Sequence, residues 1–379
     1  MEEQALTERL IGYDTSQPEG IRQCAGFVKG WLDSREVESE QLDIRGLPVT
    51  TATVGPEGAP TVLLHGHIDV VPGRPEQFEP RVEGDQLFAR GAYDMKGALA
   101  SLLLALADLR EQNDVRVRLG IVPDEESEEE IDRGGDLLVD EGFVGDFAIT
   151  GEPTNMHIGV AAKGVLAMRI EVTGRSAHGA TPWLGENAIL RALEVFRGIE
   201  SLPFASRSSE LFDRPSINLG RILGGDALNK VPDTCFIDVD VRYLPEQDPD
   251  EIRAEVAGLA DDARIVSTFS RPPAMVDPQL VYVRALCEAA AQHHADGVTS
   301  VGRDGASDAV SFLRVGIPAV EFGPLGGGHH GPEEWVSISS LASYRRAIVD
   351  FVRNLPARLA ADGAGEGAGA RSQARGGIA

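Results

Sequence analysis

Cysteine is scarce in this 379-residue sequence, which contains three in all. Cys24, Cys235 and Cys287 are scattered along the chain and show no CxxC spacing. This pattern argues against a disulfide framework and against a thiolate zinc site, and it favours a reducing compartment. We therefore expect a cytoplasmic protein.

Long apolar runs are also lacking. The longest, ALASLLLALADL, is too short to cross a bilayer. The first residues, MEEQALTERLIGYD, are acidic and do not contain the apolar stretch of a secretory signal. We expect neither a membrane span nor a secretory leader.

Positive charge is the third deficit, because 60 acidic residues face 35 basic ones and the formal net charge is −25. Such an acidic surface repels phosphate backbones and anionic lipids, so nucleic acids and membranes are disfavoured as partners. Hydrophobic residues nevertheless make up 42% of the chain, which is enough for a sizeable core. The length suggests two domains.

The order of the expected elements predicts how these domains are organised. Residues 1–163 and 277–356 alternate strand-like and helix-like segments, which is typical of an α/β sheet flanked by helices. Residues 164–276 follow the order β-α-β-β-α-β of a ferredoxin-like unit, here inserted into the first domain. Residues 357–379 are rich in glycine and alanine, and we expect a flexible tail there.

Acids and histidines follow the ends of the expected strands 61–71, 115–122, 146–150 and 317–323. Open α/β sheets place their sites beyond the carboxyl ends of their strands, so these side chains are expected to converge. A further aspartate precedes the expected buried helix 96–112. The residues concerned are His67, Asp69, Asp94, Asp124, Glu125, Glu126, Glu152, His329 and His330.

The residue types indicate metal. Two imidazoles and three carboxylates, one of them shared, can hold two divalent cations about 3.5–4 Å apart. Without thiolates, zinc is the first choice, with cobalt or manganese as alternatives. Each piece alone has an ordinary explanation, since His67 and Asp69 could be structural and DEESEEE a solvated loop. The joint pattern at successive strand ends is what favours a metal site.

Several motifs resemble a known family when they are taken in order. They include LLHGHIDVVP, FARGAYDMKGAL, IVPDEE, ITGEPT, GRSAHGATP, GDALNKVPDTCFIDVDVRYLP and HHGPEEWV. They resemble the two-zinc aminoacylase and carboxypeptidase metallopeptidases, which include succinyl-diaminopimelate desuccinylase, acetylornithine deacetylase and glutamate carboxypeptidase. The resemblance implies a zinc-peptidase-like α/β catalytic domain with an inserted ferredoxin-like lid that also mediates dimerisation. ARG replaces the usual GRG, and DMKGA replaces DMKGG, without removing an expected ligand.

The resemblance also implies a metal-ligand set, with Asp94 bridging the two cations. The expected ligands are His67, Asp94, Glu126, Glu152 and His330, with His329 as the less favoured neighbour of His330. Asp69 is expected to orient His67, and Glu125 to be the general base.

Three further residues are assigned by the resemblance to the inserted domain. His178 is expected to reach the partner's active site across a homodimer and to stabilise the oxyanion. Asn229 and Arg242 are expected to bind the substrate, Arg242 through a carboxylate.

The expected activity is hydrolysis that removes an acyl group from a small N-acyl amino acid. A carboxypeptidase or dipeptidase acting on peptides is the close alternative. A non-catalytic dimer that binds metal or acyl-amino acids is the alternative of another class. Glu125 beside Glu126 argues against that last reading, because a binding protein has no need of a base.

Overall fold

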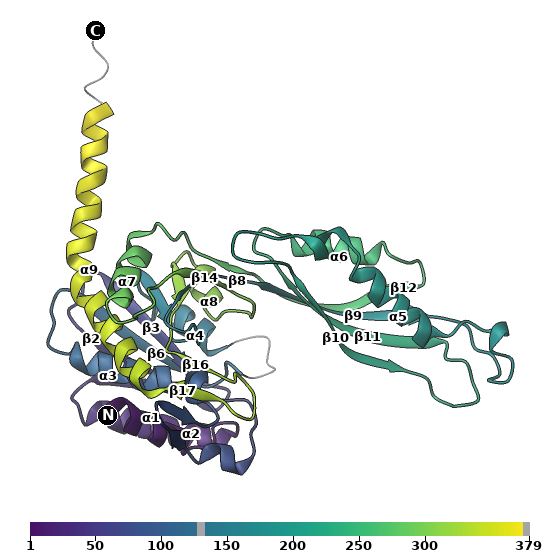
Figure 1. Cartoon of the computed structure of the whole chain (residues 1–379), viewed down its shortest axis with the longest axis horizontal. Helices are drawn as coiled ribbons and strands as arrows, with labels where there is room; N and C mark the ends of the chain where they lie inside the picture. The colour runs from purple at the N-terminus through teal and green to yellow at the C-terminus, as the bar shows by residue number, and fades with distance from the viewer. Residues whose placement is uncertain (127–132, 374–379) are drawn as a thin grey trace, which may run out of the picture. The chain divides into compact units, whose positions relative to one another are not determined.

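The computed structural model describes residues 1–126 and 133–373, and for residues 363–373 only the backbone. The chain divides into two compact units (Figure 1). The first unit comprises Met1–Val160, Val276–Val301 and Asp308–Ala379, and the second comprises Ala161–Met275 and Gly302–Ser307.

The described part of the chain alternates helices and strands. Its helices are α1 (Glu2–Ile11), α2 (Pro18–Asp33), α3 (Gly97–Asp108), α4 (Gly134–Asp140), α5 (Ala188–Ile199), α6 (Pro249–Ala257), α7 (Val281–Ala291), α8 (Val310–Leu313) and α9 (Ile338–Gln373). Its strands are β1 (Glu38–Ile44), β2 (Leu47–Val54), β3 (Thr61–His67), β4 (Arg81–Glu83), β5 (Gln86–Phe88), β6 (Arg116–Val122), β7 (Phe147–Thr150), β8 (Ile158–Ala162), β9 (Gly164–Thr173), β10 (Ser216–Gly224), β11 (Thr234–Tyr243), β12 (Ala263–Arg271), β13 (Ala274–Met275), β14 (Ser300–Arg303), β15 (Ala319–Glu321), β16 (Gly326–Gly327) and β17 (Trp335–Ser337). Within the described residues, no helix combines the length and apolarity needed to cross a membrane.

A mixed sheet forms the centre of the first unit, with the strand path β1-β2-β6-β3-β7-β15-β8. β3 pairs in parallel with β6 and with β7, and β7 pairs in parallel with β15. The predicted α/β fold is therefore confirmed. Since these four strands run in one direction, their carboxyl ends meet at a single edge of the sheet.

Both faces of the sheet are covered at its centre, which explains why β3 and β7 are buried along their length and have no solvent-facing side. On one face, Val62 and Leu64 of β3 belong to the core cluster that α2, α3, α7 and α9 share. On the other face, Leu63 packs in a cluster with Phe312 of α8. The alternation along β3 thus fixes the strand between two helical layers, and its last residue emerges at the sheet edge.

A smaller sheet of the first unit has the strand order β16-β17-β5-β4. β17 pairs with β5 in antiparallel register, with Trp335 opposite Phe88. This pairing brings the segment after Phe88, which leads to Asp94, beside the segment that follows His330.

The second unit contains an antiparallel sheet with the order β10-β11-β9-β12. Together with α5 and α6, this order is that of a ferredoxin-like unit and confirms the prediction for the inserted segment. Local sequence sets both helix starts. The Asn187 side chain accepts hydrogen bonds from two backbone N–H groups of α5, and Asp248, directly before Pro249, accepts one from the backbone N–H of Asp250 at the start of α6.

Two elements differ from the prediction. The strand expected over 61–71 ends at His67, opposite Val122, where its partner β6 also ends; Ile68 N still donates to Val122 O at 3.0 Å. The hairpin β1–β2 was not predicted. Its turn residues Arg45 and Gly46 have φ values of +54° and +79°, as a two-residue hairpin turn requires, and β1 is too polar to show strand alternation.

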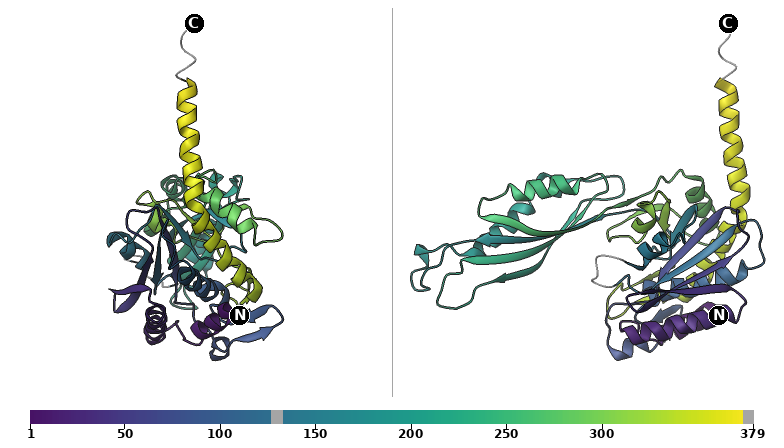
Figure 2. Two further views of the ribbon diagram at one scale, coloured as in Figure 1. Left: turned by 90° about the vertical axis from the view of Figure 1, so that its left-hand side faces the viewer. Right: turned by 180° about the vertical axis from the view of Figure 1, so that it is seen from behind.

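Part of the expected tail has helical backbone, and the flexibility expected of residues 357–379 stays a prediction. α9 continues to Gln373, with Pro356 inside it, and Figures 1 and 2 show that the helix bends along its length. Its residues beyond 356 are held on α7 by an ion pair between Arg284 and Asp362 at 2.6 Å and by another between Arg358 and Glu288. Alanine, leucine and arginine there also favour helix intrinsically. Residues 374–379 of the expected tail lie outside the described residues.

Candidate metal centre and active site

His67, at the carboxyl end of β3, is surrounded by the first group of candidate ligands. Its Nε2 atom lies 3.1 Å from Asp94 Oδ1 and 3.6 Å from Glu152 Oε1. Its Nδ1 atom lies 3.0 Å from the backbone carbonyl oxygen of Asp69. Because a carbonyl oxygen only accepts, Nδ1 carries a proton toward Asp69, which leaves Nε2 to face the two carboxylates.

Asp94 joins this group to a second one. Its other oxygen, Oδ2, lies 3.0 Å from His330 Nε2 and 2.6 Å from His329 Nε2. His330 Nε2 also lies 2.9 Å from Glu126 Oε1. Asp94 therefore turns one oxygen to each group, which is the arrangement that a carboxylate shared by two cations requires.

The Asp69 carboxylate holds the loop that follows β6. Oδ1 accepts from the backbone N–H of Glu125 at 3.1 Å, and Oδ2 accepts from that of Glu126 at 2.7 Å. The backbone carbonyl of Asp69, rather than this carboxylate, makes the shorter contact with His67, since Oδ1 lies 3.5 Å from Nδ1. Asp69 thus positions two strand ends at once, where the sequence suggested one.

Glu125 stands at the edge of this cluster. His67, Glu125 and Glu126 each offer a ligand atom within 4.8 Å of one another. Glu125 Oε1 also lies 3.5 Å from Arg133 Nη1. Burial raises the pKa of Glu125 to about 8, and the charge of Asp308 adds to this shift.

The other pKa shifts describe buried negative charge. Burial raises the pKa of Glu152 well above its usual range, and the charge of Asp94 adds to the effect. Burial alone would raise the pKa of Asp94 too, but hydrogen bonds from His329, His330 and His67 hold it well below its usual range. Hydrogen bonds to Asp94 and Glu126 raise the pKa of His330 to about 10. In the metal-free protein, protons held by imidazoles such as His330 and by the buried glutamate Glu152 thus offset part of the negative charge of the cluster.

Divalent cations suit this donor set. Glu152 Oε1 is buried and has no hydrogen-bond partner among the described residues, although it faces His67. Imidazole and carboxylate donors converge in overlapping groups that could each hold an ion. Cations would neutralise the same carboxylates that the imidazolium groups balance, so the residues fit two metal ions.

The remaining predicted site residues lie in the second unit. His178 is exposed, and its Nδ1 atom accepts from the backbone N–H of Ala180 at 3.0 Å. Gly179 N donates to the backbone oxygen of Asn229 at 2.7 Å, so His178 and Asn229 lie in adjoining loops. Arg242, on β11, instead pairs with Asp240, its Nε atom 2.9 Å from Oδ2.

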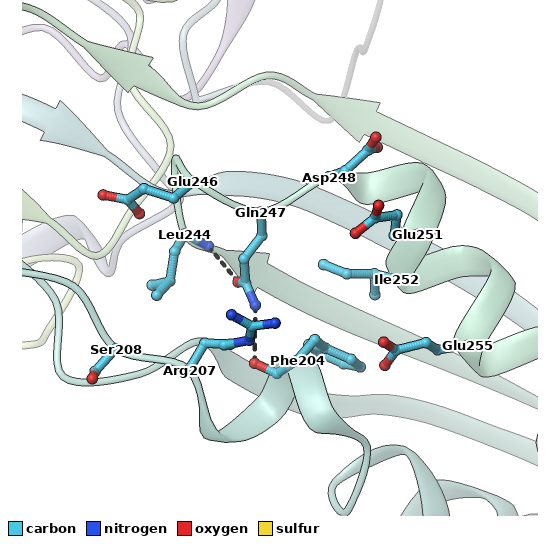
Figure 3. Close-up of a pocket in the computed structure, with 10 residues that line it drawn as sticks. All are labelled: Phe204, Arg207, Ser208, Leu244, Glu246, Gln247, Asp248, Glu251, Ile252 and Glu255. Carbon is cyan, nitrogen blue, oxygen red and sulfur yellow. Dashed lines mark hydrogen bonds between the residues drawn. The ribbon is translucent and has the colours of Figure 1, made fainter.

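The second unit also contains a pocket of about 140 Å³, and none of the predicted site residues lines it (Figure 3). Gln247 crosses it, accepting from Leu244 N at 2.8 Å and donating to Phe204 O at 2.9 Å. Acidic side chains are prominent in its lining, which contains no histidine: Phe204, Arg207, Ser208, Leu244, Glu246, Gln247, Asp248, Glu251, Ile252 and Glu255.

The sequence reasoning passed over two charged residues beside the ligands. Arg90 and Glu334 are buried, and Arg90 Nη1 donates to Glu334 Oε2 at 2.6 Å. Both stand within quoted motifs, FARGAYDMKGAL and HHGPEEWV, and charged residues so close to a ligand were the available signal. His329, the less favoured histidine, also reaches Asp94.

Comparisons with known proteins agree with this geometry. Residues 63–354 match Peptidase family M20/M25/M40. A Staphylococcus aureus (strain MRSA252) protein named probable succinyl-diaminopimelate desuccinylase is 27% identical over 364 residues, covering 84% of this chain and 88% of the relative. An Aspergillus terreus protein named probable carboxypeptidase is 30% identical over 244 residues, covering 61% of this chain and 54% of the relative.

Solved structures share the fold. Aminopeptidase PepT from Bacillus cereus has a TM-score of 0.75 at 20% identity and covers 93% of this chain and 98% of its own. The M20 family metallo-carboxypeptidase Sso-CP2 from Sulfolobus solfataricus gives 0.75 at 20% identity, covering 94% and 99%. A Bacillus subtilis protein described as a dinuclear metal binding peptidase of the M20 family gives 0.61 at 19% identity, covering 92% and 98%. The chain belongs to peptidase family M20/M25/M40 and is a hydrolase that acts on amide bonds.

Proposed function

We propose that this protein uses two divalent cations, with zinc as the favoured metal, to remove the acyl group from a small N-acyl amino acid. The observation that carries the proposal is the division of Asp94 between two ligand groups. Oδ1 faces His67 and Glu152, and Oδ2 faces His330, which in turn contacts Glu126. The similarity to proteins named desuccinylase favours an acyl amino acid as substrate.

Bound at these residues, two divalent cations supply the polarisation of the amide carbonyl and the acidity of the attacking water. Glu125 takes the proton from this water and delivers it to the leaving nitrogen. Its neighbour Glu126 is held by His330, and the Asp69 carboxylate fixes the backbone of both glutamates. The base is therefore positioned independently of its own side-chain contacts.

His178 is suited to donate a hydrogen bond to the developing oxyanion. Because its Nδ1 atom accepts from Ala180 N, the proton of the neutral ring resides on Nε2. The side chain is exposed, so this N–H group is available to a substrate. Asn229, in the adjoining loop, and Arg242 are proposed to bind the substrate. Arg242 would have to exchange its Asp240 partner for a substrate carboxylate.

A homodimer through the second unit is part of the proposal. β10 is an edge strand of its sheet, and its Ile222 and Leu223 are 39% and 49% exposed. Leu190 and Leu193 on α5 are 61% and 42% exposed. An edge strand flanked by exposed apolar side chains suits pairing with a second copy, which also covers the unpaired strand.

Hydrolysis of peptides is the second candidate. The 30% identity to a protein named probable carboxypeptidase favours it, because the match extends over 244 residues. Both candidate reactions break an amide bond, and both need the same cations and the same base. They differ in the group on the carbonyl side of the bond that breaks, which is a simple acyl group in the first candidate and an amino acid or peptide in the second. The free thiols of Cys24, Cys235 and Cys287 suit either enzyme in the cytoplasm.

Metal analysis combined with an amine-release assay tests the proposal. The zinc-loaded protein is offered succinyl-diaminopimelate, acetyl-ornithine and a panel of dipeptides, and Asp94→Asn serves as the variant without the shared carboxylate. We expect two cations per chain and turnover of an acyl amino acid, both lost in Asp94→Asn. Preference for dipeptides would establish the second candidate, and a metal-loaded protein inert toward every amide would refute both.

A further inference from the structure

Arg90 and Glu334 form an ion pair in the interior of the first unit. Arg90 is 4% exposed and Glu334 is 2% exposed, and Arg90 Nη1 lies 2.6 Å from Glu334 Oε2. A buried ion pair gives little or no net stability compared with apolar side chains, because both charges lose their hydration. Its presence beside the metal ligands therefore calls for another role.

Each member of the pair has a second contact, and each of these contacts ends on the backbone of a metal ligand. Glu334 Oε1 accepts from the backbone N–H groups of Tyr93 and Asp94, both at 3.0 Å. Arg90 Nη2 donates to the backbone oxygen of His330 at 3.1 Å. The pair thus connects the segment that carries the shared carboxylate to the segment that carries the second imidazole.

The backbone at His330 needs this support. Its φ value is +58°, in the left-handed region that residues other than glycine rarely adopt and that is strained for them. The hydrogen bond from Arg90 stabilises the carbonyl in this conformation, which turns the ring to Asp94 and Glu126. The sheet pairing of β5 with β17, and the bond from Ala89 N to Glu334 O at 3.0 Å, place both charged side chains.

We propose that Arg90 and Glu334 are positioning residues that set the geometry of the two cation sites, and we call the pair the ligand clamp. The proposal rests on the proposed metal-dependent function. Glu334 holds Asp94, which both cations share, whereas Arg90 holds only His330, which faces the second cation. Loss of Arg90 should therefore affect one cation, and loss of the Glu334 side chain should affect both.

The test titrates the chelator-stripped full chain with Co²⁺ alone, followed by visible absorption and calorimetry. Arg90→Lys keeps the charge but cannot reach two acceptors, and we expect the second Co²⁺ to bind about 10–100-fold more weakly while the first is unaffected. Glu334→Ala should weaken both steps. Arg345→Lys is the control, because Arg345 likewise donates through two guanidinium nitrogens, in its case both to the carboxylate of Asp108 at 2.7 and 2.8 Å, which is not a proposed ligand.

The double variant Arg90→Met/Glu334→Gln separates positioning from simple stability. It removes both buried charges, so its melting temperature should recover relative to Arg90→Met, while binding of the second Co²⁺ stays weak. Binding that recovers together with the melting temperature would overturn the clamp and leave the metal-dependent function intact. A wild-type chain that takes up no Co²⁺ would overturn the proposed function, and the clamp with it.

Discussion

Replacing Glu125 by glutamine tests the chemistry most sharply. Glutamine has nearly the same size as glutamate, and the backbone N–H of residue 125 would keep its bond to Asp69 Oδ1. The amide cannot take a proton from water, so the variant lacks the general base. The ligand Glu126 is held separately, through its own N–H bond to Asp69 and its contact with His330. We therefore expect the cations to stay.

The size of the loss follows from which other group could act as base. General bases contribute about 10²–10⁴-fold to the rate. Glu126 is the other carboxylate in the ligand group that contains Glu125, but its Oε1 atom is engaged 2.9 Å from His330 Nε2. Glu126 should therefore be a poor base in place of Glu125. We expect kcat to fall by about 10³–10⁴-fold, which corresponds to an increase of roughly 4–5.5 kcal/mol in the activation barrier.

The assay compares initial rates of amine release and metal content for wild type, Glu125→Gln and the control Glu141→Gln. Glu141 is an exposed acid of the same unit, at the end of α4. A Glu125→Gln variant that turns over at a rate close to that of wild type would refute the assignment of the base. Loss of one cation would instead show that Glu125 is a ligand.

Four further outcomes are expected. His178→Ala should lower kcat by about 10²–10³-fold, as for other oxyanion donors, while the dimer persists in sedimentation; unchanged kcat would remove this residue from the mechanism. Because the pKa of His330 is raised to about 10, zinc binding at pH 7 should release protons in a pH-stat, and apparent affinity should rise with pH up to about that value. The same raised pKa stabilises the metal-free fold fully below pH 6.5, so the melting temperature of the stripped protein should fall between 6.5 and about 10, and one that rises would contradict the shift. Burial raises the pKa of Cys24 to about 11, so this thiol should resist thiol reagents at pH 8 until urea is added; rapid native labelling at Cys24 would contradict its burial.

The sequence was most informative where chemistry follows a regular strand. His67 and Glu152 could be brought together in advance because β3 and β7 are apolar runs that pair in parallel, so that their ends meet. The ferredoxin-like unit was equally accessible, since its strands alternate and its helices begin at capping residues such as Asn187.

Contacts between irregular segments could not be predicted from the sequence. Arg90 and Glu334 are 244 positions apart, and strands of three residues, such as β5 and β17, are too short to show a period. Nor could spacing decide between His329 and His330, because the positive φ at His330 brings both rings to Asp94. The helical backbone at the start of the expected tail was not predicted, because its contact with α7 depends on tertiary ion pairs, such as Arg284 with Asp362.

Anomalous diffraction from a crystal of the zinc-loaded protein tests the central claim most directly. The account predicts two peaks about 3.5–4 Å apart, with Asp94 between them. One should be ligated by His67 and Glu152, and the other by Glu126 and His330. A single peak, or two peaks that do not share Asp94, would contradict the two-metal assignment.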